Sequence, residues 1–309
     1  MNKREHEPVL LAEAVNALAI QKEGIYIDGT FGRGGHSTAI VQQLARTGHL
    51  LVIDKDPDAI KAATELAVKY PQLLIEQGTF ADIGQFVAVH HWAEKIDGIL
   101  LDLGISSPQI DKAERGFSFM KEGPLDMRMD PSHGQNAADW INSAREEDLA
   151  DVFWRYGEER FSRRIAKAIV SIRAKEPIMD TKQLADIVAK AHPKWDKHKH
   201  PATRCFQAIR IYINNELKDL ERGLEESLKV LRTGGRLAVI TFHSLEEQMV
   251  KRFIRHSTHG QEMPRDLPIQ ANFFSKKLKC LGKAVKPTLD EIKINPRSRS
   301  SKLWIMEKL

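Results

Sequence analysis

Short apolar runs that end in polar or acidic residues alternate with helical patterns over the first 110 residues. The runs predict strands at 25–28, 50–54, 73–77 and 96–102, and the helical patterns predict helices at 8–19, 37–46, 57–69 and 80–91. Strands separated by single helices are typical of a parallel, doubly wound sheet. The sequence therefore predicts an α/β fold for this part of the chain.

The pattern changes between residues 111 and 215, where no apolar run predicts a strand. Periodicity there predicts helices at about 136–143, 146–155, 158–175 and 181–191, followed by a long helical stretch from 203 to 231. A further apolar run at 237–242 indicates that the sheet then resumes. We therefore divide the chain into a first α/β part (1–110), an all-helical insert (111–215) and a second α/β part with a basic C-terminal segment (216–309).

A glycine-rich loop follows the first predicted strand. The stretch Asp28-Gly-Thr-Phe-Gly-Arg-Gly-Gly-His-Ser37 allows the backbone to turn sharply and to approach a ligand closely. Asp28 would repel a pyrophosphate, but it suits the cationic groups of S-adenosyl-L-methionine. The loop lacks the Gly-x-Gly-x-x-Gly of dinucleotide sites, and its spacing differs from the usual methyltransferase loop. A glycine-rich turn that binds no ligand is the alternative at this point.

Two further strands end close to residues that suit an adenosyl group. Asp54 ends the second strand, where an acid accepts hydrogen bonds from a ribose diol. Adenosyl cofactors and NAD share that diol, so Asp54 does not choose between them. Phe80 follows the third strand, where it either stacks on an adenine or packs in the core.

The fourth and fifth strands lead into polar residues that we expect at the same edge of the sheet. Asp102 ends the fourth strand, Ser106 and Ser107 follow it, and His243 follows the fifth strand. These groups are candidates for contacting an acceptor amine. A strand-end loop capped by Ser-Ser-Pro, without a catalytic role, is the alternative. Methyl transfer depends more on the alignment of donor and acceptor than on a strong base.

Composition bounds the class of protein. The chain has 309 residues and 42% apolar residues, which is typical of a soluble globular protein. No run approaches the ~18 apolar residues of a membrane span, and the N-terminus lacks a signal-peptide core, so we expect a cytoplasmic location. Cys205 and Cys280 are too few for a disulfide framework, and His198 and His200 have no Cys or carboxylate at ligand spacing. We therefore predict no metal site.

Basic residues concentrate in the insert and in the C-terminal segment, and the net charge is +5. They face either an RNA or DNA backbone or simply solvent, and the sequence leaves both interpretations open. The three groups are Arg160, Arg163, Arg164 and Lys167; Lys194, Lys197, His198, Lys199, His200 and Arg204; and Lys276, Lys277, Lys279, Lys283, Lys286, Arg297, Arg299 and Lys302.

Several longer motifs, in the same order along the chain, closely resemble the 16S ribosomal RNA cytosine-N4 methyltransferase H family, also called MraW. The motifs are His6-x-Pro-Val-Leu-Leu-x-Glu13, the glycine-rich loop, Asp97-Gly-Ile-Leu-Leu-Asp-Leu-Gly-Ile-Ser-Ser-Pro-Gln109, Arg115-Gly-Phe-Ser-Phe119, Gly123-Pro-Leu-Asp-Met-Arg-Met129, His200-Pro-Ala-Thr-Arg204, Phe242-His-Ser-Leu-Glu246 and Asn295-Pro-Arg-Ser-Arg-Ser300.

The resemblance implies a class I, Rossmann-like methyltransferase fold with a helical insertion after the fourth strand. It implies methyl transfer from S-adenosyl-L-methionine to N4 of a cytidine in 16S rRNA, in the decoding region of the small ribosomal subunit. It assigns no catalytic base, so Ser106, Ser107 and His243 remain candidates. The family's cofactor contacts map onto Gly34, Gly35, His36, Asp54, Phe80, Asp102 and Gln109.

Other functions remain open from the residues alone. An NAD-dependent dehydrogenase would share the fold and Asp54, whereas a non-catalytic RNA-binding factor would share the basic groups but would not need the acids. A ribose 2′-hydroxyl or a DNA base is the nearest alternative acceptor. The oligomeric state, monomer or homodimer, is not determined by the sequence.

Overall fold

The computed structural model describes residues 8–194, 200–259 and 276–309. The chain forms two compact units. The first unit contains Met1–Gly104 and Leu217–Leu309, and the second contains Ile105–Glu216. Each unit is described separately.

The first unit is built on a seven-stranded sheet in the order β3-β2-β1-β4-β5-β7-β6. Its parallel strands are β1 (Ile25–Asp28), β2 (His49–Asp54), β3 (Leu73–Gln77), β4 (Ile96–Asp102) and β5 (Leu231–Thr241). Antiparallel to β5 runs β7 (Lys302–Lys308), which also pairs with β6 (Leu278–Cys280). The predicted α/β class with a mainly parallel, doubly wound sheet is confirmed.

Helices cover both faces of this sheet. Alternating side chains explain the two layers, because Tyr26, Leu50 and Val52 enter one core while Ile27, Leu51 and Ile53 enter the other. The first core is completed by α1 (Leu11–Ala17), α2 (Gly35–Val41) and α3 (Pro57–Lys69). The second is completed by α4 (Ile83–Val89), α11 (Glu216–Val230) and α12 (Ser244–His259). Short elements are η1 (Phe80–Asp82), α13 (Leu289–Ile294) and η4 (Pro296–Ser300).

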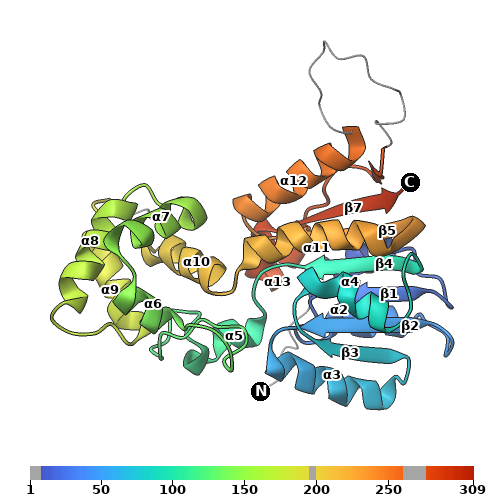
Figure 1. The fold of residues 1–309 in the computed structure, drawn as a ribbon, viewed down its shortest axis with the longest axis horizontal. Helices are drawn as coiled ribbons and strands as arrows, with labels where there is room; N and C mark the ends of the chain where they lie inside the picture. The colour runs from blue at the N-terminus through green and yellow to red at the C-terminus, as the bar shows by residue number, and fades with distance from the viewer. Residues whose placement is uncertain (1–7, 195–199, 260–275) are drawn as a thin grey trace, which may run out of the picture. The chain divides into compact units, whose positions relative to one another are not determined.

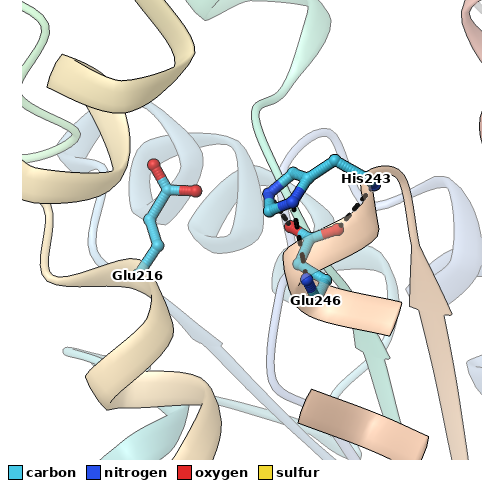
Figure 2. A group of neighbouring side chains, drawn as sticks. All are labelled: Glu216, His243 and Glu246. Atoms are coloured by element: carbon cyan, nitrogen blue, oxygen red, sulfur yellow. Dashed lines mark hydrogen bonds and ion pairs between the residues drawn. The ribbon is translucent and has the colours of Figure 1, made fainter. Parts of the chain in front are cut away.

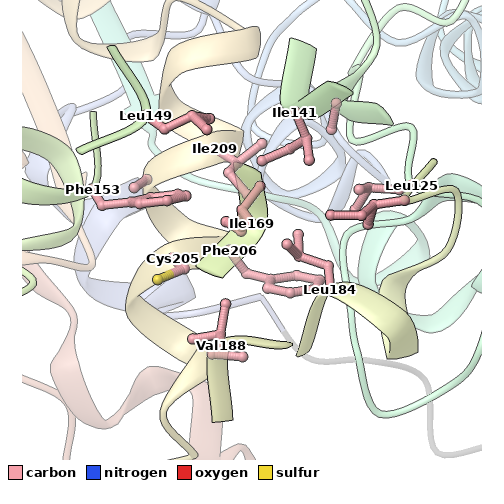
Figure 3. Packing of buried hydrophobic residues seen from close by; sticks show 14 of the residues in the cluster. Leu125, Ile141, Leu149, Phe153, Ile169, Leu184, Val188, Cys205, Phe206 and Ile209 are labelled. Atoms are coloured by element: carbon pink, nitrogen blue, oxygen red, sulfur yellow. The ribbon is translucent and has the colours of Figure 1, made fainter. Parts of the chain in front are cut away.

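The second unit is helical. It contains α5 (Ser107–Asp111), η2 (Ala113–Arg115), α6 (Ala137–Ser143), α7 (Glu146–Gly157), α8 (Ser162–Arg173), α9 (Thr181–Ala191) and α10 (Ala202–Ile213). Buried apolar side chains from α6 to α10 form its own core, in which Phe153, Ile169 and Ile209 are fully buried (Figure 3). That this unit is an independent insert bounded at 111 and 215 stays a prediction.

Two features of the chain differ from the expected elements. The helical stretch predicted at 203–231 is two helices, because the chain breaks at Asn214 and Asn215. The backbone of Asn215 is left-handed (φ 55°), and the Asn214 side chain donates to Met127 O at 2.8 Å. Strand β7 lies in the segment that we read only as basic.

Candidate functional site

Three aspartates meet where the parallel strands end, and we call this edge the carboxyl edge. Asp28, Asp54 and Asp102 are the last residues of β1, β2 and β4. β1 pairs with β2 on one side and β4 on the other, so the strand order reverses at this point (Figure 1). A ligand of a doubly wound sheet binds at such a switch point.

Asp28 is buried beneath the glycine-rich loop and braces it. Its carboxylate accepts hydrogen bonds from Ser37 Oγ at 2.5 Å and from Thr30 N at 3.1 Å. Burial raises its pKa, while the bond from Ser37 and the neighbouring His36 lower it. Only 1% of Asp28 is exposed, because both carboxylate oxygens face the loop and Ser37. Its predicted attraction for a cationic ligand stays a prediction.

Two glycines of the loop are fixed by close packing within the protein. Gly34 is the N-cap of α2, with φ 74°, and a Cβ there would lie 2.6 Å from the Phe31 ring. At Gly35 a Cβ would lie 2.2 Å from Pro8 Cγ. The loop therefore tolerates no side chain at either position. Their predicted place along the cofactor stays a prediction.

Asp54 is positioned by two backbone N–H groups. Gly32 N donates to Oδ2 at 2.8 Å, and Asp56 N donates to Oδ1 at 2.9 Å. Burial raises the pKa of Asp54 to about 6, although both bonds favour the charged form. Each carboxylate oxygen has a second lone pair, so Asp54 retains the capacity to accept hydrogen bonds from a diol.

Asp102 carries the clearest sign of a missing partner. Its buried Oδ1 has no hydrogen-bond partner among the described residues. Burial, followed by the charges of Asp28 and Glu246, raises its pKa well above the ordinary value. A buried carboxylate oxygen without a donor is costly, and an ammonium or amine group would satisfy it.

His36 lies between the loop and Asp102. Its Nε2 is 3.1 Å from Val9 O, and its Nδ1 is 3.6 Å from Asp102 Oδ2. Burial lowers the pKa of His36, so we assign a neutral ring that donates from Nε2. No Lys or Arg among the described residues forms an ion pair with Asp28, Asp54 or Asp102. The carboxyl edge is therefore suited to a cation.

Phe80 packs against glycines on both sides. A Cβ at Gly223 of α11 would lie 2.4 Å from the Phe80 ring, and one at Gly29 would lie 2.9 Å from Phe80 Cβ. This partly buried ring belongs to the core of one sheet face. Adenine stacking on Phe80 stays a prediction beside this observed packing.

Ser106, Ser107 and Gln109 belong to the second unit. Ser106 is the N-cap of the short helix α5, and Ser107 is its first residue. Gln109 is buried, and its Oε1 accepts a hydrogen bond from Ser106 N at 2.9 Å. This capping box fixes the start of the unit. The roles proposed for these residues toward a ligand stay predictions.

His243 follows β5 and is held by Glu246 (Figure 2). Glu246 Oε2 accepts from Phe242 N at 2.7 Å and from His243 N at 3.3 Å. The His243 Nε2 lies 3.0 Å from Glu246 Oε1, whereas its Nδ1 is 3.4 Å from Glu246 N. The ring thus lies over the start of α12, and its buried Nε2 makes no hydrogen bond within the described chain despite the short distance to Oε1.

Glu246 is a residue of this edge to which we gave no role from the sequence. It is 3% exposed, and its charge raises the pKa of Asp102. The spacing His243-Ser-Leu-Glu246 is that of a capping box with His as N-cap, and this spacing could have revealed it. Figure 2 also draws Glu216, which begins α11 and pairs with Arg210 at 2.8 Å.

The basic group on α8 is exposed. Arg163, Arg164 and Lys167 lie opposite the buried face formed by Ile165, Ala166 and Ile169, and Arg160 just before the helix is exposed as well. None of these four cations joins an ion pair with an acid of the described chain. The rings of His200 and Phe119 are in tilted contact, with their centroids 4.7 Å apart. Lys197, His198 and Lys199 lie outside the described residues. No helix within the described ranges is long and apolar enough to cross a membrane.

Comparison with known proteins identifies one family over nearly the whole chain, the family that the sequence motifs resemble. A model of the MraW methylase family matches residues 3–309. The ribosomal RNA small subunit methyltransferase H of Nitrosococcus oceani is 53% identical over 304 residues, covering 98% of this chain and 96% of that protein. A crystal structure of a candidate rRNA methylase from Clostridium thermocellum matches with a TM-score of 0.48 and 10% identity, covering 99% and 100% of the two chains. An rRNA methylase from Streptococcus thermophilus matches with a TM-score of 0.43 and 12% identity, covering 99% of each chain.

Proposed function

Because the chain belongs to the MraW methylase family, we propose that it transfers a methyl group from S-adenosyl-L-methionine to N4 of a cytidine in 16S rRNA of the small ribosomal subunit. The observation that carries this proposal is 53% identity, over nearly all of both chains, with a ribosomal RNA small subunit methyltransferase H. The cytosine acceptor and the decoding region follow from the motifs of that family. The proposed reaction takes place in the cytoplasm, where small subunits are found.

The carboxyl edge fits a cationic adenosyl cofactor. The unpartnered Oδ1 of Asp102 would accept a hydrogen bond from its ammonium group, and Asp54 would accept hydrogen bonds from its ribose hydroxyls. Asp28 nearby would add negative potential in its ionised form, which the hydrogen bond from Ser37 favours and burial opposes. Gly34, Gly35, His36, Phe80 and Gln109 complete the proposed cofactor set.

The cofactor supplies an electrophilic methyl group, and the protein supplies alignment. The exocyclic amine of cytosine loses a proton readily once it is methylated, so a strong base is not required. We assign Asp102 to the cofactor and keep Ser106, Ser107 and His243 as candidates for orienting the amine. Among these, His243 offers a buried Nε2 that has no hydrogen-bond partner in the described chain.

Family membership argues against a dehydrogenase, and the carboxyl edge argues against a binding protein that has no cofactor. The test uses S-adenosyl-L-methionine with a labelled methyl group and small subunits from cells that lack the protein. The methylated RNA is then digested, and its nucleosides are analysed. We expect labelled N4-methylcytidine. Label in a ribose 2′-O-methyl group, or no label at all, would contradict the proposed function.

A further inference from the structure

The segment 295–300, which contains η4, exposes its two arginines and buries Ser298 between them. Ser298 is fully buried, and its Oγ donates to Asn295 O at 2.8 Å. Ser301 Oγ donates to Ser298 O at 2.7 Å. These local hydrogen bonds fix the turn, whereas the side chains of Arg297 and Arg299 are exposed. The short helix η4 therefore presents guanidinium groups on a rigid support.

Sheet topology places this segment at the carboxyl edge. β7 runs antiparallel to β5, and Lys302, its first residue, pairs with Thr241, the last residue of β5. Figure 1 shows β7 running opposite to β4. Ile240 of β5 pairs with Asp102 of β4 on one side and with Leu303 of β7 on the other. Two strand spacings, about 10 Å, thus separate the end of β4 from the start of β7, which η4 directly precedes.

Lys286 reaches the same edge from another segment. The neighbouring Val285 exchanges two backbone hydrogen bonds with Leu303, each of 2.9 Å. Lys286 and Arg299 are both exposed, and neither joins an ion pair with any acid of the described chain. In contrast, Lys302, the first residue of β7, forms an ion pair with Glu247 at 2.6 Å. Two exposed cations without an ion pair in the described chain therefore lie at the carboxyl edge, on the β7 side of the acids.

We propose that Arg299 and Lys286, together with Arg297, clamp a backbone phosphate of the RNA beside the target cytidine. This inference rests on the proposed function, which supplies RNA as the substrate. The aspartates at the end of β1, β2 and β4 repel phosphates, so an acceptor base can enter only if its backbone is held to one side. Guanidinium and ammonium groups are the usual partners of phosphate oxygens. The clamp provides that attraction next to the acids.

The test compares the removal of cations at the carboxyl edge of the sheet with the removal of cations at its opposite edge. Arg299→Ala, Lys286→Ala and the double variant are compared with Arg46→Ala and Lys22→Ala, which remove exposed cations near the amino ends of β2 and β1. Binding of a small-subunit RNA fragment is measured over a series of salt concentrations. Each lost phosphate contact should reduce the slope of log affinity against log salt by about 0.7. The double variant should bind RNA about tenfold more weakly, with unchanged affinity for S-adenosyl-L-methionine.

Arg299→Lys keeps the charge and should keep the slope, which separates the clamp from a folding defect. Equal slopes in the Arg299→Ala and Arg46→Ala proteins would overturn the proposal. An equal loss of the salt slope in the Arg299→Lys and Arg299→Ala proteins would also overturn the proposal. If the proposed function is wrong, the unsubstituted protein will not transfer a methyl group to small subunits. The RNA-binding curves would still test the clamp in that case.

Discussion

The two aspartates at the ends of β4 have opposite environments. Near the amino end, Asp97 Oδ1 accepts from Arg232 Nε at 2.6 Å, and Oδ2 accepts from Ile25 N at 2.8 Å. At the other end, Asp102 has a buried oxygen without a donor, and no arginine or lysine of the described chain pairs with it. One aspartate is satisfied within the fold, whereas the other keeps a buried oxygen without a donor in the described chain. We propose that this difference separates a structural carboxylate from a functional one within one strand.

Asp97→Ala tests the structural half of this comparison and should have the largest effect. It leaves Ile25 N–H and the Arg232 guanidinium without their acceptor, so the free energy of unfolding should fall by about 2–3 kcal/mol. Denaturant unfolding measures this change. Affinity of the folded protein for S-adenosyl-L-methionine should stay the same. Weaker cofactor binding without lower stability would reverse the assignment of the two ends.

Asp54→Ala tests whether the functional carboxylates bind the cofactor. It removes a charge-assisted acceptor worth about 1.5–3 kcal/mol, so cofactor affinity should fall by roughly tenfold or more. Asp58→Ala is the control, because Asp58 is an exposed acid at the start of the nearby helix α3. Calorimetry that finds the same affinity in both variants would remove Asp54 from the site.

The second unit offers a comparison on a separate unit of the chain, in the exposed cations of α8. Neutralising Arg163, Arg164 and Lys167 together should reduce the salt slope of RNA binding by about two units and weaken binding by about tenfold. Cofactor affinity should not change, because these side chains are exposed on a different unit. A slope equal to that of the unsubstituted protein would show that the α8 cations only face solvent.

Cofactor affinity at the carboxyl edge should depend on pH, with a smaller change than those expected for the substitutions above and in a direction that the pKa of Asp54 sets. Because the pKa of Asp54 is raised to about 6, this group gains a proton as pH falls from 7 to 5, and cofactor affinity should fall severalfold. Stability of the unliganded protein changes in the opposite direction, since a carboxyl pKa above its unfolded value of about 3.9 favours the folded state as pH falls. Asp54→Asn should flatten both curves. Calorimetric affinity independent of pH in the unsubstituted protein would contradict this assignment.

Local patterns were sufficient for most of the first unit. The runs that end at Asp28, Asp54 and Asp102 correspond to strands because apolar residues bounded by glycine, acids or turn residues leave few other structures. The same boundaries indicated the carboxyl edge, where ligands of doubly wound sheets usually bind. Helices at 57–69 and 181–191 were also predicted with the bounds that the structure has.

Features that depend on distant partners were not predicted. Strand β7 forms only against β5, about 60 residues earlier in the chain, and its lysines made the segment read as a basic tail. The break at Asn215 requires a left-handed residue inside a continuous helical pattern. The hydrogen bond from Ser37 to Asp28 depends on the path of the loop, so charge alone did not predict it.

Asp102→Asn tests the central claim, that the unpartnered carboxylate of β4 binds the cofactor. The measurement is calorimetric affinity for S-adenosyl-L-methionine, alongside the rate at saturating cofactor. We expect affinity to fall by about tenfold or more, the rate at saturation to be largely kept, and stability to be unchanged or higher, because a costly buried charge is removed. Unchanged cofactor affinity with slower turnover would contradict the account and assign Asp102 to the cytosine amine.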